Sequence, residues 1–290
     1  MNSIIRGNFW IIAALLAISV TGCANISTGR YQTFSEANAN IQSVIVDTDI
    51  RIEKRQRDFA VLTAPNEKLT ATTFVPNIGG TSYDITSQLR SREATLDVLV
   101  KYSKLLESLA GKDLSSDVDK SAQNLAASLN GLSASSEVNT FSKVLATLAD
   151  NLAGTVTERE RKNALRSAMT TAQPAIAAIS NLLQRDYDNI AIFVNLMRDG
   201  YITHANADRP QYGTWQRYKF DSEIAARLEE FQQINDALGA ASAAIKKLPE
   251  AHQQILEGLD NKEPPLNILH DVINQAQHLH SFYRNLPSNQ

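Results

Sequence analysis

The feature that most constrains the fold of this chain is a long apolar period between residues 165 and 197. Positions recur there at alternating steps of four and three residues, and all but one are apolar: Leu165, Met169, Ala172, Ile176, Ile179, Leu183, Asp186, Ile190, Phe193 and Met197. Steps that average about 3.5 residues place these side chains on one face of an α-helix and favour shallow, coiled-coil-like crossings. Because one apolar face must be buried against other helices, the segment predicts a helical bundle.

Shorter stripes of the same kind fill most of the remaining chain. They cover residues 34–62, 85–109, 118–132, 141–152, 220–245, 249–259 and 269–283. The chain has only 12 glycines and 8 prolines in 290 residues, which is below the usual ~7% and ~5% and suits a helical protein. We therefore expect an all-α fold: an elongated antiparallel helical bundle with long coiled-coil-like helices over residues 33–290.

Several signals predict where these helices begin and end. Thr33 to Glu36 and Thr157 to Glu160 both have the form of a capping box, which starts a helix. Gly111 is a suitable helix C-cap. Residues 63–84 are rich in proline, glycine and β-branched side chains, which predicts an irregular loop that could hold a small hairpin. Residues 200–214 predict a second loop.

Three further positions predict breaks in the helices. Pro174 lies inside the longest apolar stripe, and we expect a kink or break just before it, at residues 171–173. The pair Asp199-Gly200 should end that helix. Pro249 suits the first turn of a separate short helix that runs to Leu259.

The amino-terminal residues have the pattern of an export signal. Arg6 supplies a positive charge, and the nearly continuous apolar run from Phe9 to Val20 follows it. Such a run is about 18 Å long as a helix, too short for the ~30 Å hydrocarbon core of a membrane. Val20-Thr21-Gly22-Cys23 comes next and contains the single cysteine of the chain. This arrangement resembles the lipobox of bacterial lipoproteins.

The resemblance implies a processed, lipid-anchored protein. Residues 1–22 would be the signal peptide, Cys23 would carry the lipid, and residues 23–32 would form a polar tether. Two or three acyl chains hold a protein stably on a bilayer, whereas one chain does so only marginally. In Gram-negative lipoproteins an Asp after the cysteine typically retains the protein at the inner membrane. Ala24 stands there in this chain, which implies the outer membrane, with the protein facing the periplasm.

The composition and the motifs argue against several functional classes. A net charge of -3 offers no basic footprint for nucleic acid. One cysteine excludes an internal disulfide and a cysteine-based zinc site. The chain contains no phosphate-binding loop, dinucleotide fingerprint, nucleophile elbow or HExxH pair. We therefore expect no catalytic residue, no cofactor and no metal, and we expect the five histidines to be solvated or to cap helices.

Some charged residues have two interpretations. Asp186 interrupts the longest stripe, and a buried carboxylate there would have a raised pKa. A straight helix drifts about 20° per heptad, however, so we expect Asp186 to face water. The basic clusters at residues 51–57 and 159–162 could bind phosphate groups, but acidic residues are interleaved with them. We expect both clusters to lie on solvated helix faces.

The segment from residue 201 to residue 220 is the candidate partner-binding surface. It combines aromatic and basic side chains, which are enriched in binding hot spots, and the candidates are Tyr201, Tyr212, Trp215, Arg217 and Tyr218. The alternative is that Trp215 and its neighbours plug one end of the bundle. Exposed aromatic side chains would favour binding, and packed ones would favour the plug.

These observations favour a lipid-anchored envelope protein with a non-catalytic binding, scaffold or spacer role. Its partners would be the membrane, through the lipid, and an unidentified envelope protein or cell-wall component, but not nucleic acid. The alternative is a periplasmic small-ligand carrier or enzyme with a pocket between helices. A pore-forming toxin is disfavoured, because no other apolar run approaches the 18 residues that a membrane span needs.

Overall fold

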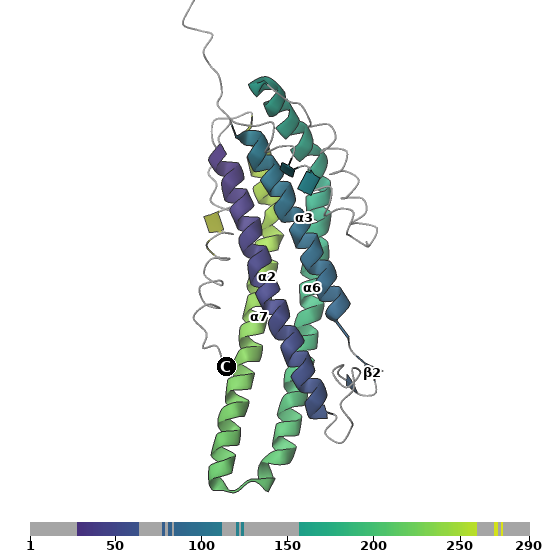
Figure 1. Cartoon of the computed structure of the whole chain (residues 1–290), viewed down its shortest axis with the longest axis vertical. Helices are drawn as coiled ribbons and strands as arrows, with labels where there is room; N and C mark the ends of the chain where they lie inside the picture. Colours follow the sequence, from purple (N-terminus) through teal and green to yellow (C-terminus); the bar gives the residue numbers. More distant parts are fainter. Residues whose placement is uncertain are drawn as a thin grey trace, which may run out of the picture.

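The computed structural model describes residues 28–63, 77–78, 81–82, 84–111, 120–121, 123–124, 157–259, 270–271 and 274. Within these residues the long helices are α2 (Thr28–Thr63), α3 (Thr86–Ala110), α6 (Glu158–Asp208) and α7 (Thr214–Glu257). The 3₁₀ turn η2 (Arg209–Gln211) joins α6 to α7, and the short strands β1 (Asn77–Ile78) and β2 (Thr81–Ser82) pair between α2 and α3. The helices form an elongated bundle (Figure 1), which confirms the predicted all-α fold.

Contacts near the helix ends show that the helices alternate in direction. Arg161, at the start of α6, donates a hydrogen bond to the C=O of Gly111 just after α3. Arg30, at the start of α2, lies so close to Gly258 after α7 that a Cβ there would collide with its guanidinium. The start of α2 therefore lies at the opposite end of the molecule from the turn between α6 and α7 (Figure 1).

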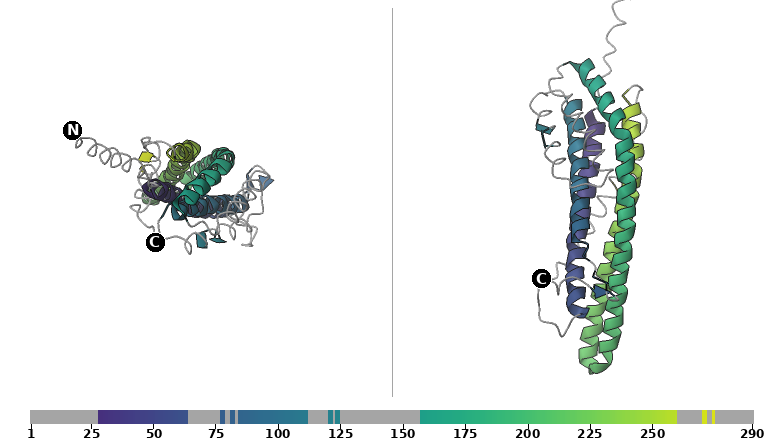
Figure 2. Two further views of the ribbon diagram at one scale, coloured as in Figure 1. Left: turned by 90° about the horizontal axis from the view of Figure 1, so that it is seen from above. Right: turned by 90° about the vertical axis from the view of Figure 1, so that its right-hand side faces the viewer.

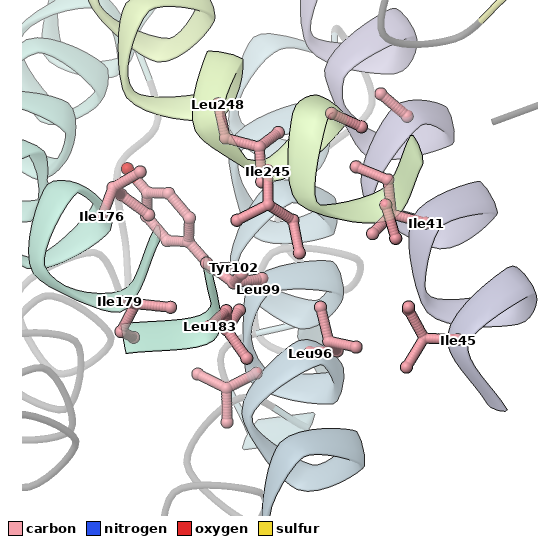
Figure 3. Close-up of a cluster of buried hydrophobic side chains, with 14 of the residues drawn as sticks. Ile41, Ile45, Leu96, Leu99, Tyr102, Ile176, Ile179, Leu183, Ile245 and Leu248 are labelled. Carbon is pink, nitrogen blue, oxygen red and sulfur yellow. The ribbon is translucent and has the colours of Figure 1, made fainter. Parts of the chain in front are cut away.

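The core lies along the axis between the four helices. Figure 3 shows one layer of it, to which every helix contributes: Ile41 and Ile45 from α2, Leu96 and Leu99 from α3, Ile176, Ile179 and Leu183 from α6, and Ile245 and Leu248 from α7. Each of these side chains is at most 2% exposed. Burying one such side chain contributes about 1.5–3 kcal/mol, so stripes of this length account for the assembly of the bundle.

The longest helix did not end where the sequence predicted. Residues 200–208 continue α6 instead of forming a loop, so only residues 209–213 separate α6 from α7. Gly200 has a packing role: a Cβ at this position would lie 2.5 Å from Cζ of Phe59 on α2. The glycine therefore permits the close approach of two helices, and the prediction that it stops α6 was wrong.

The start of the first helix was also predicted too late. α2 begins at Thr28, so residues 28–32 are helical and do not belong to a tether. The Thr33 hydroxyl donates a 2.7 Å hydrogen bond to the C=O of Gly29, one turn earlier. Gln32 and Glu36 pair across the next turn. Thr33 thus lies inside the helix, and its resemblance to a capping residue was misleading.

Two prolines lie inside helices that remain continuous. α6 passes through Pro174 without a break, although its first part leans away from the bundle axis (Figure 2). α7 passes through Pro249, so the predicted separate helix to Leu259 is the last part of α7. The side chain of Gln173 donates a 2.9 Å hydrogen bond to the C=O of Pro249, which joins the two proline-containing regions.

Other predicted boundaries agree with the structure. Thr157 caps α6 with its side chain, and Glu160 caps back, as the capping box predicted. α3 ends at Ala110 with Gly111 as its C-cap. Strands β1 and β2 form the small antiparallel hairpin expected within residues 63–84, with Ile78 opposite Thr81. The predicted signal peptide and the helices expected at 118–132, 141–152 and 269–283 lie outside the described residues, apart from a few helical positions.

Beyond the ends of α2 and α3 the molecule narrows to two helices. α6 and α7 continue past them as a hairpin (Figures 1 and 2), and we name residues 201–226 the distal hairpin. The part of α7 that belongs to the distal hairpin, residues 214–226, is about 20 Å long. The larger apolar side chains of the hairpin, Ile202, Phe220 and Ile224, are only half-buried, because neither α2 nor α3 extends far enough to cover them.

Candidate functional site

The end of the distal hairpin presents two aromatic rings to solvent. Trp215 and Tyr218 lie three residues apart at the start of α7 and are 67% and 63% exposed. Their ring centres are 5.5 Å apart at an interplanar angle of 18°, so the rings are stacked. Nζ of Lys219 lies 5.6 Å from the centre of the Trp215 ring. A structural role as a plug would require Trp215 to be packed, and it is not.

The other candidate side chains of this segment build the hairpin. The rings of Tyr212 and Phe220 pack with their centres 4.8 Å apart. Half-buried Tyr201 packs against Phe231 of α7, at 6.3 Å between ring centres. Nη2 of Arg217 donates a 3.1 Å hydrogen bond to the C=O of Tyr212. The predicted set therefore divides into a supporting group and the exposed pair, Trp215 and Tyr218.

A surface ion pair closes the turn of the hairpin. Nε and Nη2 of Arg209 each donate a 2.7 Å hydrogen bond to the carboxylate of Asp221. These hydrogen bonds lower the pKa of Asp221. The two-point geometry fixes the approach of η2 to α7 and holds the exposed pair on a defined convex end.

At the base of the distal hairpin lies a buried arginine that the sequence analysis placed on a solvated face. Arg55 of α2 is 2% exposed and lies 3.0 Å from a carboxylate oxygen of Asp58 and 3.5 Å from one of Glu230 on α7. Desolvation lowers its pKa. A usable signal existed, because Arg55 fills the helical position between Ile52 and Phe59 in the apolar stripe of α2.

Halfway along the bundle three charged side chains meet, and we name Asp49, Arg92 and Asp186 the ion cluster. Nη2 of Arg92 donates a hydrogen bond to Asp49, and both residues are at most 2% exposed. Nη1 of Arg92 lies 3.5 Å from Asp186, whose side chain is 27% exposed. Asp186 is therefore directed toward the interior, and the expectation that it simply faces water was wrong.

The ion cluster carries two carboxylates and one guanidinium. Burial raises the pKa of Asp49 to about 7, against the opposing effect of Arg92, and it also raises the pKa of Asp186. Cζ of Arg92 lies 5.0 Å from the ring centre of Tyr187. Oδ2 of Asp49 and the Tyr187 hydroxyl have no hydrogen-bond partner in the described part of the chain. The cluster links α2, α3 and α6 but leaves polar atoms unsatisfied.

A second polar group, Tyr102, Gln173 and His252, lies within the core, and we name it the neutral cluster. His252 is 0% exposed, so the expectation that the histidines are solvated or cap helices was wrong for it. Its Nε2 lies 2.8 Å from the Tyr102 hydroxyl, and its Nδ1 is hydrogen-bonded to Oε1 of Gln173. Burial lowers the pKa of His252 to about 3, so the ring is neutral.

The bonds of the neutral cluster fix the tautomer of the ring. The C=O of Pro249 can only accept, so the Gln173 group that faces it is the NH₂. Oε1 of Gln173 therefore faces His252 and accepts from Nδ1–H. Nε2 is then unprotonated and accepts from the hydroxyl of Tyr102. Every ring nitrogen has a partner, which is the requirement for a buried polar side chain.

These buried clusters do not form an accessible reaction centre. His252, Asp49 and Arg92 are at most 2% exposed, so a substrate could reach them only if the helices separated. In the parts of the chain that the structure describes, no group of three or more His, Cys, Asp or Glu side chains is placed to hold a metal ion. The exposed end of the distal hairpin is therefore the better candidate functional site.

Comparison with protein families, curated sequences and solved structures gives no match. Among the described helices, none combines the length and apolar character required to span a bilayer.

Proposed function

We propose that this protein is a lipid-anchored helical spacer that presents a binding surface at the end of the bundle far from its anchor. The lipobox-like segment that ends at Cys23 supplies the anchor. The helix α2 begins at Thr28, a few residues later, so the anchor attaches to the end of the bundle where α2 starts. The distal hairpin then points away from the membrane that holds the lipid.

The length of the bundle supports a spacer. α6 contains 51 residues, which corresponds to about 75 Å of helix. Its capping, its continuous stripe and its packing on α7 make it a stiff rod. A partner bound at the distal hairpin would therefore be held at a nearly fixed distance from the anchoring membrane.

The observation that carries the binding role is the exposed Trp215–Tyr218 pair. Large apolar rings normally contribute to stability by burial, and these two contribute little to the core because each is more than 60% exposed. Tyr and Trp offer a large contact area at a low cost in side-chain entropy, and both are enriched in binding sites. A non-catalytic role fits this surface, because it presents aromatic rings and cations rather than a convergent acid–base pair.

Lipid attachment is tested by metabolic labelling with an acyl probe. The wild-type protein should incorporate the probe, and Cys23→Ala should abolish incorporation and leave an uncleaved precursor. Equal labelling of both proteins would contradict the anchor.

The binding surface is tested by site-specific photo-crosslinking in intact envelopes. A photoreactive side chain at position 215 should give defined adducts, whereas one at position 192 should give none. Ile192 is a matched control, because it is 60% exposed on α6 but lies outside the distal hairpin. Equivalent adducts at both positions, or none at either, would contradict a specific surface at the distal end.

A further inference from the structure

We infer that the exposed end of the distal hairpin docks on the headgroup layer of an anionic lipid bilayer. This inference rests on the proposed function, which places the hairpin opposite the anchor, and it names the chemistry of the partner. Three observations carry it: the exposed aromatic pair, the sign of the local charge and the small convex shape of the contact surface.

The tip of the hairpin carries a local excess of basic groups. Residues 209–221 contain Arg209, Arg217 and Lys219 against Asp221, a balance of +2, and the adjoining Asp208 and Glu223 bring the whole distal hairpin to a balance of 0. The whole chain has a charge of -3, so its acidic excess lies outside the distal hairpin. An anionic surface therefore repels this end less than the rest of the rod, and the basic groups at the tip, with Lys219 beside Trp215, supply the attraction.

The aromatic pair suits the interface of a bilayer. Trp and Tyr rings concentrate at the headgroup level, where the apolar body enters the acyl boundary and the polar atom stays hydrated. Trp215 and Tyr218 are adjacent on one side of α7, and Lys219 lies beside the Trp215 ring. The rings can therefore enter the interface while the ammonium remains among the anionic headgroups.

The shape of the end favours a bilayer over a folded protein. A stable protein interface buries about 800 Å² per partner through about 20–30 residues on each side. The hairpin end is convex and is formed by one short turn and the first residues of α7 (Figure 1). Insertion of two rings into a bilayer needs no matching pocket and no minimum footprint, because the lipids rearrange around the side chains.

The test uses the full processed protein, anchored by its own lipid in vesicles of phosphatidylcholine. Flotation of the protein with these vesicles checks the anchor separately. Fluorescent vesicles of phosphatidylcholine mixed with phosphatidylglycerol are then added, and their capture is measured. We expect capture of the anionic vesicles, little capture of pure phosphatidylcholine vesicles, and weaker capture as salt increases.

Lys219→Glu should reduce the affinity of this capture by about thirtyfold, because each basic residue near an anionic surface contributes and the change reverses one of them. The matched control is Lys246→Glu, which makes the same charge change at an exposed position of α7 in the bundle body. It should capture vesicles nearly as well as the wild type. The paired variant Trp215→Ala with Tyr218→Ala should lose capture, and Ile50→Ala, which alters another exposed apolar residue, should retain it.

Emission from Trp215 gives an independent readout. The sequence has two tryptophans, and Trp10 lies in the predicted signal peptide, so the processed protein reports on Trp215 alone. Docking should shift the emission to shorter wavelengths and reduce quenching by acrylamide. Equal capture of anionic and neutral vesicles, equal effects of Lys219→Glu and Lys246→Glu, or an unchanged emission would each overturn the inference.

Two further outcomes separate this inference from the proposed function. A defined protein adduct at position 215 without any capture of vesicles would overturn the lipid assignment and support a protein partner. Failure of the protein to float with phosphatidylcholine vesicles would contradict the anchor. Flotation of that unanchored protein with anionic vesicles would then support the lipid inference, and its failure to float with them would overturn it.

Discussion

The ion cluster and the neutral cluster are two solutions to the burial of polar side chains in one bundle. Both link helices that are distant in sequence, and both contain side chains that are almost fully buried. The neutral cluster pairs both ring nitrogens of His252 and carries no charge. The ion cluster holds two carboxylates against one guanidinium, and among the described residues Oδ2 of Asp49 has no hydrogen-bond partner.

The difference shows what a bundle core tolerates. A neutral hydrogen-bonded group avoids most of the desolvation penalty of a charge and can be stabilising if every donor and acceptor is paired. A buried ion pair loses hydration energy that its attraction only partly restores. The neutral cluster should therefore stabilise this fold, whereas the ion cluster should mainly impose which helices meet and in which register.

Removing the central cation should have the largest effect. Arg92→Met preserves much of the side-chain volume but leaves Asp49 and Asp186 near each other without a counter-charge. We expect a loss of about 3–5 kcal/mol in the free energy of unfolding, measured by urea denaturation near neutral pH. Asp49→Asn should change stability far less or raise it. If Arg92→Met and Asp49→Asn lower the free energy of unfolding equally, the ion cluster stabilises the fold as the neutral cluster does, and the contrast between them fails.

The two clusters should give opposite pH dependences. Asp49 has its pKa raised from 3.8 to about 7, so its contribution to stability is complete below pH 4 and is lost as the pH rises through 7. His252 has its pKa lowered from 6.5 to about 3, so its contribution is complete above pH 6.5 and is lost as the pH falls through 3. Between these limits the two effects partly cancel in the wild-type protein.

Single variants separate these effects. Urea denaturation of Asp49→Asn at a series of pH values should show stability that rises with pH, because the contribution of His252 remains. His252→Gln should show the reverse slope, because the contribution of Asp49 remains. Each pKa unit of difference corresponds to about 1.4 kcal/mol. Parallel slopes in the two variants would contradict the assignment.

Breaking the neutral cluster should have a moderate effect. Tyr102→Phe removes the hydroxyl that donates to Nε2 of His252 and leaves that nitrogen buried and unpaired. We expect a loss of about 1–3 kcal/mol, seen as a lower melting temperature. His252 should then become easier to protonate, so NMR titration should give it a higher pKa than in the wild type. A variant as stable as the wild type would show that the cluster contributes nothing.

The smallest effect on stability should come from the distal hairpin. Trp215→Ala removes a ring that is 67% exposed, so the free energy of unfolding should change by less than about 0.5 kcal/mol. The same substitution should nevertheless weaken the vesicle capture described above, which the paired change at Trp215 and Tyr218 should abolish. A loss of several kcal/mol would show that Trp215 packs as a plug after all.

The buried polar residues explain how far the sequence could predict the interior. The apolar stripe of α3 omits one helical position between Leu89 and Leu96, and Arg92 fills it. His252 likewise continues the stripe of α7 after Leu248. The helical period indicates that these positions face inward, but residue type alone suggests that a charged or polar side chain is solvated. Residue type led us to expect solvated side chains at Arg55 and His252, and the burial of both contradicts that expectation.

The candidate site could be predicted only in part. The concentration of aromatic and basic residues between 201 and 220 identified the segment, and their division into supporting and exposed side chains required the structure. Tyr212 and Trp215 are both aromatic and lie three residues apart. One packs on Phe220, and the other is stacked on a neighbour in solvent. Nothing in their local sequence separates the two.

The sequence by itself determined the helices, because the apolar period and the capping residues act over one or two turns of chain. The capping box at Thr157 and the C-cap at Gly111 are local chemistry, and both occur as predicted. Only the tertiary structure decided whether a potential helix breaker acts as one. Gly200 continues α6 because Phe59 of another helix fills the space beside it. The tertiary structure also decided which buried polar groups have hydrogen-bond partners, because those partners lie on helices far apart in the sequence.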